Sequence, residues 1–484
     1  MSCKGLYITI FLIAFILTGC SEDQPVYLPP EPPATGVGEA TAWVTTGNRN
    51  RLLHQETDII IFEGQQTDLP STSIDFDDLL QEMDGFGAAL TGSSAWLINR
   101  QMSNAQSQQL LTDLFHQTNG IGVSYLRLPM GSSDFSLSNY TYNDLLPGQS
   151  DPELEFFSIA PDQQDIIPVL KRILDINPEI KIMGSPWSAP AWMKTNGSLM
   201  GGKLKEEWYD TYALYFVKFI QAYAQEGITI DAITIQNEPL HETSGYPTMR
   251  MEAHEQNLFI REHLGPLFNQ HGITARIIIY DHNWDRPDYP ILILDDPVTR
   301  NYVAGSAFHA YAGSVSAMSQ VHATHPDKGL YFTEISGGGW ATDFSDNLKW
   351  KMSNIFIGTA NHWSKNALLW NLALDENDGP TNGGCQNCRG VVTILPGGNV
   401  ERNEEYYALA HMSKFVQPGA RRAESTGFPS SDNLESVAFV NPDGSKVLVV
   451  LNSNNSQKSF AVKFDDKFFE YRIDGNAVAT ILWQ

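Results

Sequence analysis

The sequence predicts an α/β protein in which a (β/α)8 TIM barrel carries an appended antiparallel β-sandwich. Between about residues 84 and 416, short apolar runs of strand length alternate with amphipathic helical segments. This alternation is typical of parallel strands joined by crossover helices. After about Pro418 the runs become short and are separated by turn signals such as Asn441-Pro442-Asp443-Gly444, which indicates antiparallel strands.

The barrel prediction depends on eight apolar runs and on the helices between them. A helix is predicted at residues 208–226, where aromatic residues recur at three- and four-residue steps, and another at 253–270, with Gly272 just past its end. The eight predicted barrel strands are 85–88, 123–128, 180–185, 232–236, 276–280, 305–309, 330–333 and 367–370.

The predicted sandwich comprises residues 417–484, with strands at 434–441, 446–452, 459–464, 470–473 and 477–482. Two earlier runs, 43–46 and 59–63, precede any helix. We therefore expect the segment 40–83 to contribute strands to the same sandwich.

The composition limits the functions that the chain can have. The 484 residues suffice for one large domain and a smaller one, and 42% hydrophobic with 18% charged residues is an ordinary globular balance. Lys and Arg number 31 against 56 Asp and Glu, a formal charge of −25. Such an acidic surface repels a phosphate backbone, so nucleic acid is not an expected partner, and a neutral polymer is a better candidate than an acidic one.

The first twenty residues are predicted to be a lipoprotein signal peptide. Lys4 is followed by an apolar stretch at 6–17, which ends in Leu17-Thr18-Gly19-Cys20. This ending resembles the lipobox of bacterial lipoproteins, which implies lipidation of Cys20; an ordinary secretory signal is the alternative. A proline-rich tether is predicted at 21–39. We expect membrane contact through this N-terminal anchor alone and a location in the bacterial cell envelope, at the outer-membrane surface.

Two further cysteines, Cys385 and Cys388, lie three positions apart. A structural zinc usually needs four ligands, and the chain has no second pair of this kind. Outside the cytoplasm the expected outcome is a small disulfide that stiffens a loop, and a redox role is the less favoured alternative. No metal or other cofactor is expected.

Two segments end on a glutamate. Glu238 follows the apolar run that starts at Ile233, and Glu334 follows the run that starts at Leu330. A barrel gathers the carboxyl ends of its strands at one face, so the two side chains are expected to meet there. Two opposed carboxylates are the minimal set for cleaving a glycosidic bond.

Five motifs extend this prediction, and in this order they resemble glycoside hydrolase family 30, the family of glucocerebrosidase and of bacterial and fungal β-1,6-glucanases. The resemblance covers the chain from about residue 85 to its end. The motifs are Arg127-Leu128-Pro129-Met130 with Ser133-Asp134-Phe135-Ser136, the run at 185–194 that contains Trp187, Asn237-Glu238-Pro239, Ser244-Gly245-Tyr246-Pro247, and Trp370-Asn371-Leu372-Ala373-Leu374.

The resemblance implies a retaining β-glycosidase with Glu238 as the acid/base and Glu334 as the nucleophile. Glu238 is then expected to have a raised pKa, and Glu334 to stay ionised with help from Arg127. His309 is expected to be a hydrogen-bonded wall residue and not a proton carrier. The residues that the resemblance assigns to substrate binding, with Asn237 on the sugar 2-hydroxyl, are Arg127, Asp134, Trp187, Asn237, Tyr311, Trp370 and Asn371.

Three departures from the glucocerebrosidase pattern favour a β-1,6-glucan as the substrate. They are Ala310 between His309 and Tyr311, Gln236 before the Asn-Glu-Pro motif, and the cysteine-containing loop at 379–390. Glucosylceramide or another β-glycoside remains the alternative within the family. A xylan-cutting activity is disfavoured, because we find no clear basic cluster for glucuronate.

Two other classes of protein remain open. A surface lipoprotein could bind glycans without cutting them, although a binder does not require paired carboxylates. A metal-dependent barrel hydrolase usually needs a histidine cluster, and the chain contains no His-Glu-x-x-His motif.

Overall fold

The computed structural model describes residues 1–2, 36–64 and 66–484 of the chain. Cys20, the apolar part of the predicted signal peptide and most of the predicted tether lie outside the described residues. The first strand begins at Gly36, so the last four residues assigned to the tether belong to a sheet. No helix in the described ranges combines the length and the apolarity that crossing a bilayer requires.

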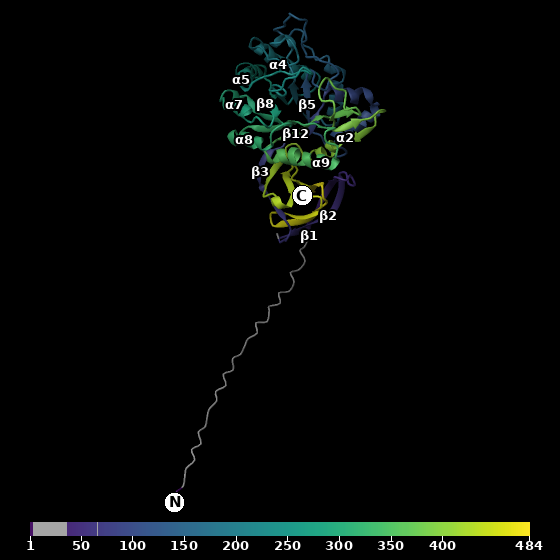
Figure 1. Ribbon diagram of the computed structural model, residues 1–484, viewed down its shortest axis with the longest axis vertical. Helices are drawn as coiled ribbons and strands as arrows, with labels where there is room; N and C mark the ends of the chain where they lie inside the picture. Colours follow the sequence, from purple (N-terminus) through teal and green to yellow (C-terminus); the bar gives the residue numbers. More distant parts are fainter. Residues whose placement is uncertain (3–35, 65) are drawn as a thin grey trace. The chain divides into compact units, whose positions relative to one another are not determined.

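Eight parallel strands form the barrel, and their order around the ring follows the chain (Figure 1). The ring closes between its last two strands, where Lys365 N–H donates to the carbonyl of Leu330 at 2.8 Å and Trp370 N–H donates to that of Ile335 at 2.9 Å. Each predicted barrel strand overlaps an observed one. The strands are β4 (Gly85–Ala89), β5 (Tyr125–Met130), β6 (Lys181–Pro186), β7 (Ala232–Thr234), β8 (Arg276–Asn283), β9 (Val303–His309), β10 (Gly329–Glu334) and β12 (Asn366–Asn371).

The barrel interior is a packed core and not a pore. Nearly all residues of its strands are buried, because helices cover the outer face and side chains fill the inner one. One buried cluster inside the barrel takes a side chain from each of seven strands: Tyr125, Met183, Ala232, Ile278, Ala307, Tyr331 and Leu368.

Helices connect the strands on the outside of the ring (Figure 1). The aromatic residues of the predicted helix at 208–226 are buried on α4, as expected for core packing. The α-helices are α1 (Gly92–Trp96), α2 (Asn104–Phe115), α3 (Ile166–Ile176), α4 (Tyr209–Gln225), α5 (Ala253–Leu258), α6 (Gly265–His271), α7 (Asp288–Leu294), α8 (Ser316–Thr324), α9 (Phe344–Trp350), α10 (Ile357–Asn361) and α11 (Glu404–Ser413). Short 3₁₀ turns are η2 (Asp162–Gln164), η3 (Ala191–Met193), η4 (Glu206–Trp208), η6 (Thr299–Asn301) and η8 (Ser430–Asp432).

The helix predicted at 253–270 is present but changes its winding in the middle. It consists of α5, the π-helical turn η5 (Phe259–Leu264) and α6 in direct succession. Pro266 has no N–H to donate to the carbonyl four residues earlier, and the wider turn lies just before it. Gly272 ends the helix with a φ of 63°, as its position predicted. Two more π-helical turns, η1 (Leu97–Gln101) and η7 (Lys351–Phe356), extend α1 and α9.

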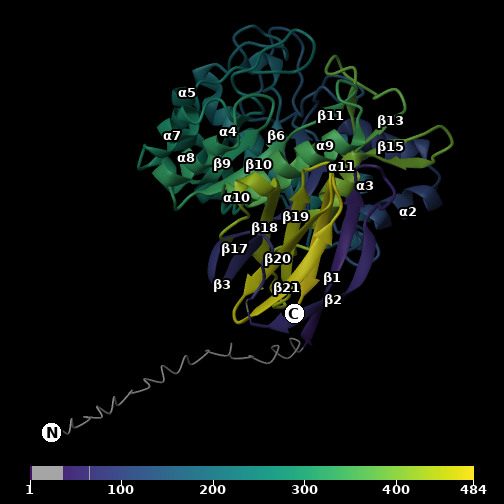
Figure 2. The ribbon, with the colours of Figure 1, turned by 60° about the horizontal axis from the view of Figure 1, so that its bottom comes forward.

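The predicted sandwich is one closed sheet of nine strands (Figure 2). Strands near the start of the chain lie in this sheet: β1 pairs with β2 and β22, and β3 pairs with β17 and β20. The strand β3 was not predicted, because acidic residues at 75, 77 and 78 interrupt its apolar pattern. The strands are β1 (Gly36–Thr46), β2 (His54–Glu63), β3 (Ser71–Glu82), β17 (Arg421–Ser425), β18 (Leu434–Val440), β19 (Lys446–Asn452), β20 (Lys458–Phe464), β21 (Lys467–Ile473) and β22 (Ala477–Trp483).

A buried histidine joins the last barrel helix to this sheet. His411 on α11 contacts the hydroxyls of Thr480 and Thr45, each at 2.9 Å from one of its ring nitrogens. Because both partners are neutral hydroxyls, burial lowers the pKa of His411 to about 3 and the ring is uncharged.

Cys385 and Cys388 form the predicted disulfide. Its loop is tied to the segment after Glu334, because β14 (Cys388–Arg389) pairs with β11 (Gly337–Gly338). The remaining short strands of the barrel face are β13 (Ala373–Asp375), β15 (Val392–Ile394) and β16 (Val400–Arg402).

Candidate active site

The two glutamates lie at the carboxyl ends of barrel strands. Glu334 is the last residue of β10, whereas Glu238 lies four residues beyond the end of β7. The backbone at Glu238 has a φ of 45°, in the left-handed region, and its N–H donates to the carbonyl of Asp281 at 3.0 Å. A glutamate held in this conformation indicates a side chain whose direction is fixed by its surroundings.

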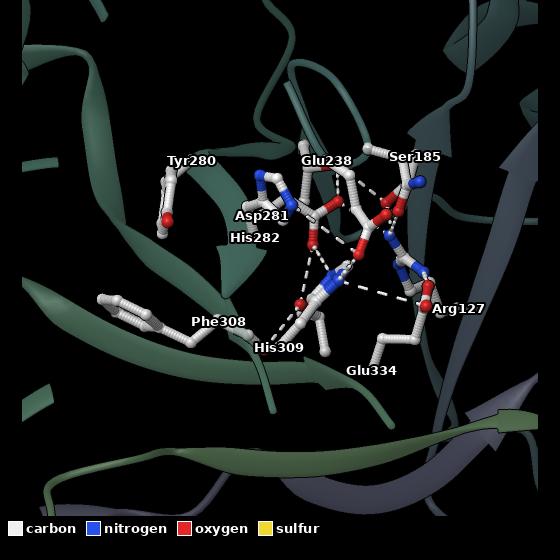
Figure 3. A network of polar contacts seen from close by, with 12 residues as sticks. Arg127, Ser185, Glu238, Tyr280, Asp281, His282, Phe308, His309 and Glu334 are labelled. Carbon is white, nitrogen blue, oxygen red and sulfur yellow. Dashed lines mark hydrogen bonds and ion pairs between the residues drawn. The ribbon is translucent and has the colours of Figure 1, made fainter. Parts of the chain in front are cut away.

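The two carboxyl groups face one another across a narrow space (Figure 3). One oxygen of each glutamate and a ring nitrogen of His309 all lie within 4.8 Å of one another. Retaining glycosidases separate their carboxyl groups by about 5–5.5 Å, and inverting enzymes by about 6.5–9.5 Å. The observed spacing therefore suits direct attack by one carboxylate, as in a retaining enzyme.

Arg127, at the centre of β5, is fully buried beneath the pair. It donates to Glu334 Oε2 at 2.6 Å and to Asp281 Oδ2 at 2.8 Å. It also donates to Asn237 Oδ1 at 2.8 Å and to Ser185 Oγ at 3.1 Å. One guanidinium thus fixes four side chains from different strands and places a positive charge against Glu334.

Asp281 is the second buried charge of the network. Its two oxygens accept four hydrogen bonds from Arg127, His309, Thr234 and Thr333, at 2.7–3.0 Å. Although burial opposes ionisation, Arg127 and His309 hold the pKa of Asp281 well below its usual range. Asp281 is therefore a fixed negative charge that orients its two cationic neighbours.

His309 lies between the glutamates and Asp281 (Figure 3). Its Nε2 contacts Asp281 Oδ1 at 3.0 Å and its Nδ1 contacts Glu238 Oε1 at 3.1 Å, with Glu334 Oε1 at 4.0 Å. Burial favours the neutral ring, but the charges of Glu334, Asp281 and Glu238 outweigh it and raise the pKa of His309 to about 9. The ring is therefore protonated at neutral pH and donates from both nitrogens.

The protonation of the glutamates differs from the expectation drawn from the sequence. Burial would raise the pKa of Glu238, but the hydrogen bond and charge of His309 outweigh burial and hold that pKa below its ordinary value. Burial raises the pKa of Glu334, and the charges of His309 and Arg127 act against this rise. The expected raised pKa of Glu238 is thus wrong for the substrate-free site, because the nearest proton is held by His309.

A second histidine lies near Glu238. His282 Nε2 is 3.9 Å from Glu238 Oε1, and its buried Nδ1 has no hydrogen-bond partner among the described residues. Burial lowers the pKa of His282 to about 4, so this ring is neutral where His309 is charged.

Two predicted binding residues contact the network. The hydroxyl of Tyr311 donates to Glu334 Oε1 at 3.0 Å. The side-chain oxygen of Asn237 accepts a hydrogen bond from Arg127. The amide nitrogen of Asn237 therefore points away from Arg127 and can donate to a ligand.

The predicted tryptophans form a wall, but they expose little ring area. Trp187 and Trp370 stack on one another with ring centroids 5.1 Å apart, and the Arg127 guanidinium lies 4.9 Å from the ring of Trp187. Both indoles are buried, so they offer a sugar little free ring face.

Asp134 and Asn371 complete the predicted set. Burial and the charge of Glu334 raise the pKa of Asp134 well above its ordinary value, so it can act as a neutral carboxylic acid toward sugar hydroxyls. Asn371 accepts from Thr91 through Oδ1 at 2.8 Å, and its buried Nδ2 has no partner within the described part of the chain.

The disulfide loop covers the wall. Cys388 packs in one buried cluster with Phe135, Trp187 and Trp370. A Cβ atom added to Gly384 would lie 2.4 Å from the Cβ of Asp134, so only glycine allows the loop to approach this closely.

The residues Glu238, His309 and Glu334 form a geometry that could hold a metal ion, and among the described residues no other group does so. A metal needs a lone pair on a ring nitrogen, however, and the raised pKa of His309 together with its two carboxylate partners keeps both nitrogens protonated. The donor set therefore suits proton and glycosyl transfer better than metal binding.

Comparison with known proteins identifies the family of the chain. Residues 83–416 match the glycosyl hydrolase family 30 TIM-barrel domain, and residues 419–481 match the β-sandwich domain of the same family. The chain belongs to glycosyl hydrolase family 30 and is a glycoside hydrolase.

Three similar proteins represent the range of relatives. Endo-1,6-β-D-glucanase neg1 of Aspergillus fumigatus is 36% identical over an alignment of 401 residues, and the match covers 77% of this chain and 79% of that protein. The lysosomal acid glucosylceramidase of Mus musculus is 32% identical over an alignment of 425 residues, and the match covers 84% of this chain and 81% of that protein. The structure of the endo-β1,6-glucanase BT3312 has a TM-score of 0.84 and 35% identity, and covers 92% of this chain and 99% of its own.

The structure brings five of the predicted residues into one network through His309: Arg127, Asn237, Glu238, Tyr311 and Glu334. Trp187 and Trp370 pack against Arg127, whereas Asp134 lies against the disulfide loop and Asn371 contacts Thr91. Sequence reasoning expected His309 as a hydrogen-bonded residue of the site wall, and its contacts with Glu238 and Asp281 agree with this, but it missed the central position of Asp281. Asp281 directly follows an apolar run, which predicts a place at the end of a strand but not this central position.

Proposed function

We propose that the protein hydrolyses β-1,6-linked glucan with retention of the anomeric configuration. The observation that carries this proposal is the pair of carboxyl oxygens of Glu238 and Glu334 within 4.8 Å of each other, with Arg127 against one and His309 against the other. This arrangement provides one nucleophile and one proton donor at the same bond.

In the first step Glu334 is the nucleophile. Its carboxylate oxygen attacks the anomeric carbon while the bond to the leaving oxygen breaks, and a glycosyl ester forms. Arg127 and the Tyr311 hydroxyl hold Glu334 in position. Glu238 gives a proton to the leaving oxygen.

His309 supplies the proton for this step. It is protonated beside Glu238, and the negative charge of Glu334 is one of the causes of its high pKa. That charge disappears as Glu334 becomes an ester, so the pKa of His309 falls and its proton passes along the 3.1 Å contact to Glu238.

In the second step water replaces the leaving group. Glu238, now ionised, takes a proton from the water while the water oxygen attacks the anomeric carbon. The ester bond to Glu334 breaks, and the β-anomer of the sugar is released. As the charge of Glu334 returns, the proton on Glu238 passes back to His309. Asn237 binds the 2-hydroxyl, where hydrogen bonds strengthen as positive charge develops on the ring.

Support for a β-1,6-glucan comes from the relatives and from the charge of the chain. The two endo-glucanases are 36% and 35% identical, slightly more than the glucosylceramidase at 32%. The formal charge of −25 suits a neutral polysaccharide. Ala310 and Gln236 depart from the glucocerebrosidase pattern at two positions beside the site.

To test this function, the purified protein is incubated with β-1,3-, β-1,4- and β-1,6-glucans and with glucosylceramide. The products are then analysed for their length and anomeric configuration. Short oligomers of the β-anomer from the β-1,6 polymer alone support an internally cutting glucanase. Glucose alone indicates cleavage from a chain end, and preference for glucosylceramide contradicts the proposal.

The Glu334→Gln variant distinguishes a catalytic function from that of a glycan-binding lipoprotein. An enzyme loses turnover and keeps its affinity for the glucan, whereas a binding protein shows no turnover before or after the change. Chelation leaves the activity intact if the reaction proceeds as proposed.

We further propose that Cys20 carries the lipid that anchors the protein in a bacterial envelope, at the outer-membrane surface. The support is the sequence Leu17-Thr18-Gly19-Cys20 after an apolar stretch. Mass spectrometry of the mature N-terminus, and loss of membrane association in Cys20→Ala, test this proposal.

A further inference from the structure

A cavity of about 470 Å³ opens beside the catalytic pair. Ile335 and Ser336, which directly follow Glu334, contribute to its lining, and so does Tyr311. Because the Tyr311 hydroxyl donates to Glu334 at 3.0 Å, one side chain belongs both to this cavity and to the catalytic centre. The cavity therefore borders the catalytic centre and shares Tyr311 with it.

The cavity gathers exposed aromatic rings. Trp340 and Trp350 line it with Tyr311, and their exposed fractions are 57%, 42% and 45%. Phe156 is the one other large exposed aromatic side chain in the described residues, and it lies elsewhere. Three aromatic rings that remain exposed around one hollow indicate a ligand with an apolar face.

The Trp340 indole is held in place by the surrounding backbone. A Cβ atom at Gly338 would lie 2.2 Å from the Trp340 ring, so this ring packs directly on the backbone of β11. Gly339 N–H donates to the carbonyl of Asn387 in the disulfide loop at 2.8 Å, and Asn347 donates to the carbonyl of Ala341 at 2.8 Å. A binding surface that is already ordered loses little conformational freedom when a ligand arrives.

We propose that this cavity is a subsite for a further glucosyl unit of the substrate chain, which binds on the faces of Trp340 and Trp350. The inference rests on the proposed function. A pyranose has an apolar C–H face that matches an indole and a rim of hydroxyls that needs polar partners. The lining also contains Ser336, Asp346 and Asn347, whose side-chain oxygens can accept hydrogen bonds from such hydroxyls.

The test uses β-1,6-linked gluco-oligosaccharides of two to six units. In the wild type kcat/KM rises at the length that first fills the subsite. In Trp340→Ala and in Trp350→Ala we expect the ratio of kcat/KM between long and short oligomers to fall about tenfold, the effect of about 1.4 kcal/mol of lost contact. Phe156→Ala, which removes an exposed ring away from the cavity, leaves that ratio unchanged.

The possible failures are distinguishable. An unchanged ratio in both tryptophan variants overturns the subsite, and so does an equal loss at every length, because the rings would then act on the catalytic centre. Failure of the wild type to cleave any of these oligomers contradicts the proposed function instead.

Calorimetry tests the subsite without catalysis. We expect Glu334→Gln to bind longer oligomers more tightly, and the added Trp340→Ala change to remove this gain. Equal affinities at all lengths, or a gain for glucosylceramide alone, contradict a sugar subsite.

Discussion

Asp281 accepts a hydrogen bond from Nε2 of His309 at 3.0 Å, and this bond directs the other ring nitrogen to Glu238. Asp281 also accepts from Arg127, which is bonded to Glu334. One buried carboxylate thus orients the cation beside each of the two glutamates. The proton donor and the nucleophile are positioned by the same group.

Replacing His309 by glutamine should lower kcat on glucan about 100-fold, because the variant cannot store a proton beside Glu238. The loss should be much smaller for a dinitrophenyl β-glucoside, whose leaving group needs no protonation. Steady-state kinetics with both substrates measure the difference. His325→Gln removes a histidine paired with Asp295 at 3.1 Å outside the site and should leave kcat unchanged. Equal losses on both substrates would contradict a role in proton supply.

The pH profile of kcat/KM should reflect the ionisation of Glu334 and of His309. Burial raises the pKa of Glu334, so activity should be lost on the acidic side at a higher pH than an exposed glutamate would give. On the basic side it should decline as His309 loses its proton near pH 9. In His309→Gln the basic limb should move, and a basic limb unaltered by this change would assign it to another group.

Arg127→Lys should lower kcat about 100-fold and the free energy of unfolding by about 3 kcal/mol, because an ammonium cannot bond to Glu334, Asp281 and Asn237 together. Activity assays and denaturant unfolding give the two values. The matched control is Arg100→Lys, which alters a half-exposed pair with Asp165 and should change stability by less than about 1 kcal/mol. A fully active, stable Arg127→Lys protein would refute the role assigned to the guanidinium.

Replacing Cys385 and Cys388 together by serine should raise KM about fivefold and change kcat little, a loss of about 1 kcal/mol in binding. The disulfide loop packs on Trp187 and Trp370 and contacts Asp134, so loosening it weakens the sugar-binding wall and not the catalytic pair. Reduction of the wild type should produce the same KM, and the double variant should not respond to reductant. Unchanged KM in both experiments would mean that the loop does not shape the site.

His411 should make the fold sensitive to acid. Its folded-state pKa, about 3, lies below the unfolded value of about 6.5, so its contribution to stability is full above pH 6.5 and is lost as the pH falls toward 3. Between pH 7 and pH 4 the loss should be about 3 kcal/mol. Urea unfolding of the wild type and of His411→Gln at both pH values measures it, since glutamine cannot titrate. Parallel pH dependences in the two proteins would exclude His411 as the cause.

The sequence located the strands and the two glutamates because both leave a local pattern. Each barrel strand is a continuous apolar run, and Glu334 comes at the end of one. The strand β3 left no such pattern, because much of its length faces solvent and carries acidic residues.

The central role of Asp281 could not be predicted in this way, because it depends on a local change of backbone direction. Tyr280 and Asp281 have φ values of 72° and 65°, and the pairing register of β8 with β9 shifts at this point. Side chains that would alternate along a regular strand are redirected here. The high pKa of His309 likewise follows from three carboxylates that only the folded chain brings together.

The pairing of β1 with β22 has a consequence for biogenesis. The second neighbour of β1 is β22, which follows the whole barrel in the chain and is therefore synthesised after it. Until then an open, hydrogen-bonding flank of β1 stays available to other chains. A chain cut before Ala477 would leave that flank exposed for good, so this truncation should yield aggregates and not a shortened enzyme.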